Sequence, residues 1–114
     1  MTQHSVIVKF YDFGARFWTE EQRSLDPLFA LEEELEEVLE GTGAGELDGH
    51  EIAVDGSDGL LFLYGPDADA LFAAIEPVLR KSAVMLGADA TLRYGEPGED
   101  DAKQRLINID QTTH

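Results

Sequence analysis

The amino-acid sequence predicts an α+β fold, a ferredoxin-like two-layer sandwich with the element order βαββαβ. Three observations carry this prediction: two amphipathic helix patterns, strand patterns before and after each of them, and a glycine-rich turn that joins the two middle strands as a hairpin. Such a fold has one antiparallel sheet with both helices on one face. The right-handed rule for crossover connections then favours the strand order 4-1-3-2.

Length and composition favour one domain that covers residues 1–114. A hydrophobic content of 43% is typical of globular proteins and too high for a disordered chain. The absence of cysteine excludes a disulfide framework and a thiolate metal site. Because the first residues lack the features of a signal peptide and no apolar run is long enough to span a bilayer, we expect a cytoplasmic protein without membrane contacts.

The net charge of −16 is the strongest feature of the composition. No Lys or Arg lies between Arg23 and Arg80, an interval that holds fifteen acidic residues. Binding to nucleic acid requires clusters of Lys and Arg, so nucleic acid is not an expected partner. The negative electrostatic potential of such a surface favours binding to a basic protein partner, or it serves high solubility alone.

The first strand is predicted at Ser5–Tyr11, where apolar residues alternate along a β-branched and aromatic segment. Its even-numbered and odd-numbered residues point to opposite faces. The connection Asp12–Ser24 then holds three aromatic residues, Phe13, Phe17 and Trp18. Clustered aromatics in a loop either anchor a partner or fold back over the edge of the core, and the sequence leaves both interpretations open.

A helix is predicted at Asp26–Glu40. Asp26 is in place to cap its first turn, Pro27 suits the first helical position, and Gly41 suits a left-handed stop. Apolar residues recur at steps of three and four and predict one buried face: Leu28, Leu31, Leu35, Val38 and Leu39.

The rest of this helix is almost wholly acidic. This helix contains no Lys or Arg that could pair with its glutamates, which are Glu32, Glu33, Glu34, Glu36, Glu37 and Glu40. Like charges four residues apart cost about 0.2–0.5 kcal/mol per pair, and the C-terminal end of a helix favours cations. A solvated face is one interpretation. A docking face for a basic protein is the other, with Glu33, Glu36, Glu37 and Glu40 as the candidate partner-binding residues.

A hairpin is predicted after this helix. Its first strand spans Glu46–Asp55, and a bulge at Asp48-Gly49 resets the alternation, because Leu47 is out of phase with the residues that follow. Residues 56–59 form the tip. The segment Leu60–Tyr64 is apolar throughout, which predicts a central strand covered on both faces.

The second helix is predicted at Asp67–Ser82, with Pro77 inside it. A fourth strand follows at Ala90–Tyr94. We expect a flexible acidic loop at about residues 95–102, a short edge strand at Arg105–Ile109 and a frayed tail at residues 110–114.

Three segments resemble a group of small uncharacterised bacterial proteins: GELDGHEI (residues 45–52), LFLYGPDADALFAAIEPVLR (residues 61–80) and GADATLRYG (residues 87–95). The resemblance covers roughly the C-terminal two thirds of the chain. It implies the two-layer fold. It implies no activity, because none is assigned to that group.

His50 is the candidate for a proton shuttle near neutral pH. Strand alternation puts it in phase with Ile52 at the rim of the core and turns Glu51 to the other face, so Asp48 is the acid in place to orient the ring. A structural histidine is the simpler interpretation. No Ser or Thr has a His and an acid at a catalytic spacing, so we expect no catalytic residue and no enzyme.

Two motifs suggest ligand loops but are incomplete. Asp55, Ser57 and Asp58 resemble the start of a calcium loop without its later ligands, so we expect a turn and no metal site. Residues 41–45 are rich in glycine, but they lack a lysine and precede a strand, so a phosphate loop is not expected. No pattern predicts a cofactor.

The face of the sheet away from the helices is predicted to be uncovered. It carries a mixture of apolar and charged residues. The apolar part is larger than a soluble monomer usually exposes to water. A homodimer or the C-terminal segment would cover it. A more specific interpretation is that this face binds a small ligand through Lys9, Tyr11 and Arg93.

We therefore expect a non-enzymatic acidic binding module that docks a basic protein surface through its Glu-rich first helix. The alternative is a ligand-binding or regulatory domain that uses the open sheet face, as a dimer.

Overall fold

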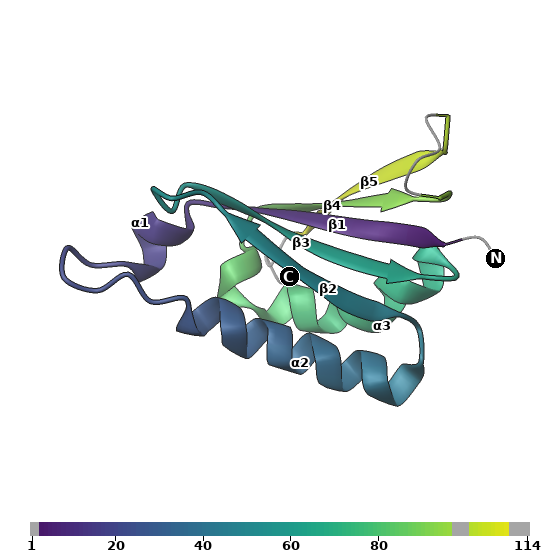
Figure 1. Cartoon of the computed structure of the whole chain (residues 1–114), viewed down its shortest axis with the longest axis horizontal. Coiled ribbons are helices and arrows are strands. Elements are labelled where there is room, and N and C mark those ends of the chain that lie inside the picture. The colour runs from purple at the N-terminus through teal and green to yellow at the C-terminus, as the bar shows by residue number, and fades with distance from the viewer. Residues whose placement is uncertain (1–2, 97–100, 110–114) are drawn as a thin grey trace, which may run out of the picture.

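The computed structural model describes residues 3–96 and 101–109, and its central element is a five-stranded antiparallel sheet (Figure 1). The strands are β1 (His4–Tyr11), β2 (Glu46–Ile52), β3 (Asp58–Gly65), β4 (Ala88–Arg93) and β5 (Gln104–Ile109). The helices are α1 (Phe13–Phe17), α2 (Asp26–Thr42) and α3 (Ala68–Lys81), followed by a short 3₁₀ helix, η1 (Ala83–Met85). The α+β class is thereby confirmed.

The strands are arranged in the order β2-β3-β1-β4-β5, and every neighbouring pair is antiparallel. Read from the other edge, β1 to β4 follow one another as 4-1-3-2, and β5 extends the sheet beyond β4. The sheet therefore has one strand more than a four-stranded βαββαβ sandwich. Both long helices lie on the same side of it, with α2 below β2 and β3 in Figure 1.

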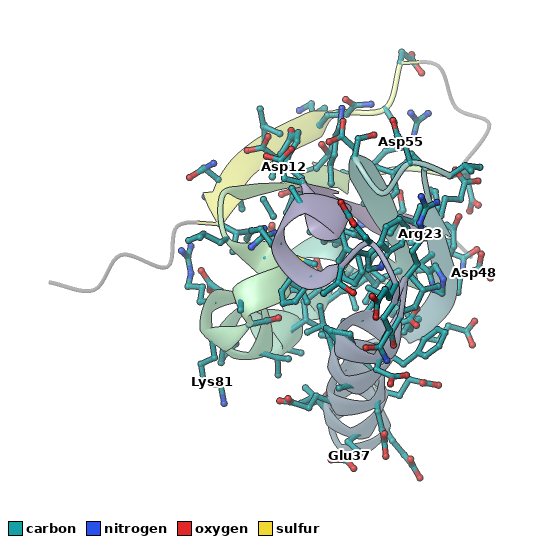
Figure 2. The ribbon with its side chains drawn as sticks, turned by 90° about the vertical axis from the view of Figure 1, so that its left-hand side faces the viewer. Asp12, Arg23, Glu37, Asp48, Asp55 and Lys81 are labelled. Carbon is teal, nitrogen blue, oxygen red and sulfur yellow. The ribbon has the colours of Figure 1, made fainter. Side chains whose placement is uncertain are left out.

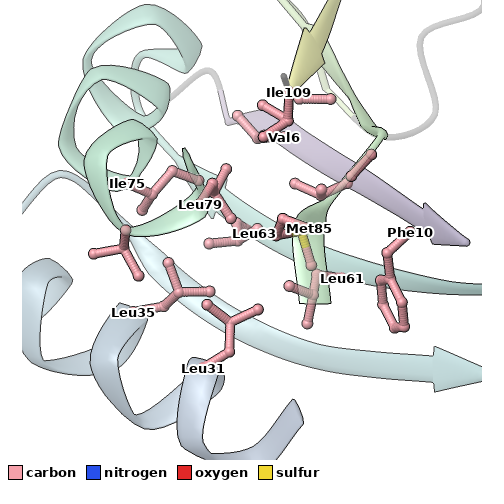
Figure 3. Packing of buried hydrophobic residues seen from close by; sticks show 14 of the residues in the cluster. Val6, Phe10, Leu31, Leu35, Leu61, Leu63, Ile75, Leu79, Met85 and Ile109 are labelled. Atoms are coloured by element: carbon pink, nitrogen blue, oxygen red, sulfur yellow. The ribbon is translucent and has the colours of Figure 1, made fainter. Parts of the chain in front are cut away.

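The core fills the space between the sheet and these two helices (Figure 3). The even-numbered residues of β1 point into it, as the alternation predicts: Val6, Val8 and Phe10. They meet the buried stripe of α2, namely Leu28, Leu31, Leu35 and Leu39. Non-directional burial of these apolar side chains is the main force that holds the layers together.

Both ends of α2 differ from the prediction. The helix begins at Asp26 without a side-chain cap from that residue, and the hydroxyl of Ser24 accepts the Asp26 N–H at 3.0 Å instead. At the other end the helix runs two residues beyond Glu40. Gly43, with φ 68°, is the left-handed stop, and its N–H donates to the Leu39 carbonyl at 2.8 Å. Gly41 was therefore the wrong choice of terminating residue.

The aromatic connection folds back over the end of the core. Phe13 is fully buried, and Trp18 packs edge-on against it with ring centroids 6.2 Å apart. The Trp18 indole N–H donates to the Ser24 carbonyl at 2.9 Å. Arg16 donates to the carbonyls of Tyr11 and Val84, which ties α1 to η1. The segment is thus a structural cover and contains a helix that the sequence did not predict.

The hairpin confirms one prediction and corrects two. The register of β2 shifts between Leu47 and Gly49, where the bulge was expected. However, β2 ends at Ile52, and Val54 is 92% exposed in the turn beyond it. In β3 only the odd-numbered apolar residues are in the core, Leu61 and Leu63. The intervening side chains lie on the open face, because the helices cover only one side of the sheet.

The C-terminal half follows the predicted pattern. Asp67 caps α3 by accepting the Asp69 N–H at 3.0 Å, and Pro77 lies within this helix. β5 pairs with β4 along its length and does not fold over the open face. Residues 97–100 of the acidic loop and the whole predicted tail at 110–114 lie outside the described residues. Within the described chain, no helix has the length and apolarity needed to cross a membrane.

Candidate protein-binding surfaces

The four candidate partner-binding glutamates share one exposed face of α2. Glu33, Glu36, Glu37 and Glu40 are spaced at three and four residues, and all are exposed. Figure 2 shows Glu37 pointing away from the rest of the molecule. Among the residues that the structure describes, none of these carboxylates forms an ion pair. The last turn of α2 contains no basic residue, so its negative helix end is also uncompensated.

Glu32, on the same helix, has a different role. Its Oε2 lies 2.9 Å from Nδ1 of His50 in β2. Because a carboxylate only accepts, the proton of this hydrogen bond belongs to Nδ1 of the ring. The contact links α2 to the edge strand of the sheet. His50 is therefore oriented by Glu32 and not by Asp48, which is exposed.

Phe29 is a residue of this surface that sequence reasoning missed. Its side chain is 49% exposed, and its ring centroid lies 5.9 Å from that of His50. It lies one helical turn before Glu32 and Glu33, so an aromatic ring is set at the margin of the acidic face. The sequence could have indicated that Phe29 is exposed, because this residue falls outside the three- and four-residue steps of the leucine stripe. We call the set Phe29, Glu33, Glu36, Glu37 and Glu40 the α2 surface.

The open sheet face brings together two of the three candidate ligand-binding residues. Lys9 Nζ lies 5.4 Å from the ring centroid of Tyr11. Arg93 pairs with Ser5, four residues along β1 from Lys9, which is about 13 Å at the rise of a strand. The three side chains therefore do not converge on one point.

A hydrogen-bonded cluster occupies the Tyr11 end of this face. The Tyr11 hydroxyl donates to Oδ2 of Asp89 at 2.7 Å, and the Asn108 amide donates to Oδ1 at 2.9 Å. The bond from Asn108 and then the bond from Tyr11 hold the pKa of Asp89 below its ordinary value. The same bond to Asp89 raises the pKa of Tyr11. Both oxygens of Asp89 are thus engaged within the fold.

The other candidate motifs have structural roles. Asp55 Oδ1 accepts the Ser57 N–H at 2.9 Å, and hydrogen bonds from Ser57 lower the pKa of Asp55. This arrangement is a turn stabilised by its own side chain. Within residues 3–96 and 101–109, no three His, Asp or Glu side chains are grouped so as to hold a metal ion. His4 is also structural, since its Nδ1 accepts the Ala68 N–H at the start of α3.

Comparisons with protein-family models, curated proteins and solved structures gave no match for this chain. The resemblance to small bacterial proteins therefore stays a prediction. Functional arguments rest on the surfaces of the molecule itself.

Proposed function

We propose that this chain is a non-enzymatic module that binds a basic protein through the α2 surface. One observation carries the proposal: four exposed carboxylates without ion-pair partners among the described residues adjoin a half-exposed phenylalanine on one helix. An aromatic anchor beside a charged rim is the composition that protein interfaces favour.

The energetics of the helix support this proposal. Glu33 and Glu37, and Glu36 and Glu40, are like charges one turn apart, and each pair costs about 0.2–0.5 kcal/mol in a helix. A basic partner removes this repulsion and supplies the cations that the end of the helix lacks. The attraction also steers the encounter and accelerates association.

The α2 surface is held in place before any partner arrives. Four buried leucines fix α2 on the sheet, and the bond between His50 and Glu32 fixes its position beside β2. A preformed surface loses little conformational entropy on binding. We propose that the scaffold is a ferredoxin-like sandwich in which β5 is an added edge strand.

The test compares two triple variants of equal net charge. Glu33→Lys, Glu37→Lys and Glu40→Lys alter the α2 surface, whereas Glu20→Lys, Glu21→Lys and Asp101→Lys alter exposed acids elsewhere. Each variant and the wild type are used to capture proteins from native lysate at low salt, with elution at high salt. We expect the first variant to lose a basic protein that the wild type and the second variant retain. Equal retention by both variants would contradict the proposal.

A second candidate function is a dimeric ligand-binding or regulatory domain that uses the open sheet face. It is supported by the apolar side chains on that face, among them Ile7, Phe62 and Leu106, of which Leu106 is 70% exposed. Sedimentation equilibrium and thermal shift with small-molecule ligands test it. It predicts a dimer, and a rise in Tm that Arg93→Ala abolishes. A monomer with no ligand response would dismiss it.

A further inference from the structure

A groove runs along β2 and β3 on the open face of the sheet. It consists of three adjoining cavities with volumes of about 480, 380 and 330 Å³. The first and second share Tyr64, and the second and third share Glu51. Each cavity shares a lining residue with the next, so the three lie in a row along β3, and we call this row the groove.

The floor of the groove carries evenly spaced apolar and aromatic side chains, and the middle cavity is the most polar of the three. Leu60, Phe62 and Tyr64 point to the open face from β3, with Gly59, Leu61, Leu63 and Gly65 buried between and beside them. Every second residue of a strand repeats at about 6.6–6.8 Å. An extended polypeptide has the same repeat, so its alternate side chains meet successive floor residues.

The walls of the groove are acidic. Their carboxylate residues are Glu46, Asp48, Glu51, Asp58 and Glu96. Among the described lining residues, Lys9 is the one Lys or Arg. Glu46, Asp48 and Glu51 are exposed, and none of them forms an ion pair within the described parts of the chain. This lining attracts cationic groups and repels phosphate groups and other anions.

Acidic residues on β2 also have a simpler role, because charges and bulges on an edge strand prevent it from pairing with another chain. That role explains the charges on β2. It does not explain the apolar floor next to them on β3. The net charge of −16 on each copy argues against a second copy of the chain as the occupant of this groove, so the dimer considered above would have to pair the part of the open face outside it.

We infer that this groove binds an extended peptide segment of a partner protein in which Lys or Arg alternates with apolar residues. The peptide backbone lies along the boundary between β2 and β3, with its two rows of side chains directed to either side. The apolar row covers Tyr64, Phe62 and Leu60, and the opposite, basic row reaches the carboxylates of β2. The groove and the α2 surface adjoin at His50, which lines the middle cavity and contacts Glu32 of α2. Their carboxylates differ, because Glu46, Asp48 and Glu51 lie on β2, whereas the acids of the α2 surface lie on the helix. The inference therefore rests on other acidic residues than the function proposed for α2.

The probe is a fluorescein-labelled ten-residue peptide of alternating lysine and valine, titrated with the full chain and followed by fluorescence anisotropy. Two control peptides replace valine by serine or lysine by glutamate. We expect saturable binding of the lysine–valine peptide and at least about tenfold weaker binding of either control. Equal binding of the lysine–serine peptide would overturn the role of the floor.

Two double variants locate the site. Asp48→Lys with Glu51→Lys alters the groove, and Glu36→Lys with Glu37→Lys makes the same change in charge on α2. We expect the first to weaken peptide binding by about tenfold or more and the second to change it by less than about threefold. Absence of saturable binding, or equal losses in both variants, would overturn the inference. The proposed function of α2 is judged separately by the retention of the captured basic protein.

Discussion

His50 Nδ1 in β2 lies 2.9 Å from Glu32 Oε2 in α2. This contact joins the edge strand to the acidic helix and sets the position of the α2 surface. It also gives the central histidine a partner in α2, because Nδ1 of the ring donates to a carboxylate of that helix. The proposed binding function depends on this placement of α2.

Loss of this contact should destabilise the protein. Glu32→Ala removes the acceptor of the His50 N–H, and we expect the free energy of unfolding to fall by about 1 kcal/mol. The matched control is Glu34→Ala, a change at an exposed position of the same helix, with an expected effect within about 0.5 kcal/mol. Urea denaturation measures both. Equal losses in the two variants would show that the contact does not contribute.

The true end of α2 can be tested with two glycines. Gly41→Ala lies inside the helix with open space around its Cα, so it should stabilise the protein by about 0.5–1 kcal/mol. Gly43→Ala forces a side chain into φ 68° and should destabilise it by about 1 kcal/mol. Thermal unfolding gives both signs. The reverse order would place the helix stop at Gly41.

The cluster around Asp89 should produce a pH dependence of defined sign. Because hydrogen bonds from Asn108 and Tyr11 lower the pKa of Asp89 in the folded protein, its contribution is present above the unfolded pKa of about 3.9. It is lost as the pH falls through the folded pKa. Asn108→Ala should therefore raise the pKa of Asp89, as measured by NMR titration. It should also lower stability at pH 7 more than at low pH. An unchanged pKa would contradict this account.

The acidic surface of α2 should oppose stability while it serves binding. Glu40→Lys removes the repulsion with Glu36 and places a cation at the C-terminal end of the helix, so the free energy of unfolding should rise by about 0.5–1 kcal/mol. The same substitution should weaken binding of the captured basic partner. Denaturation and an affinity titration measure the two effects. A more stable variant with unchanged affinity would favour a merely solvated face.

Much of the fold follows from local pattern. The leucine stripe of α2 and the bulge before Gly49 were both predicted correctly, because periodicity reports which side of an element is buried. The prediction that β3 is covered on both faces was wrong for a related reason. A run such as LLFLY indicates apolar surroundings, but it does not reveal that helices cover one face only.

The contacts of the site were less accessible to sequence reasoning. The sequence predicts Asp48 as the acid that orients His50, whereas the observed partner, Glu32, lies eighteen residues away in the sequence. The groove also combines residues from two strands whose register is set by the bulge. Such long-range relations depend on how helix and sheet pack, which no local pattern records.

The most direct test of the central claim is an amide NMR spectrum of the isotope-labelled chain, titrated with the basic protein captured from lysate. We predict that the largest chemical-shift changes occur in α2 from Phe29 to Glu40, and that Glu33→Lys, Glu37→Lys and Glu40→Lys together abolish them. Changes confined to the sheet, with α2 unaffected, would contradict the claim that α2 is the docking surface.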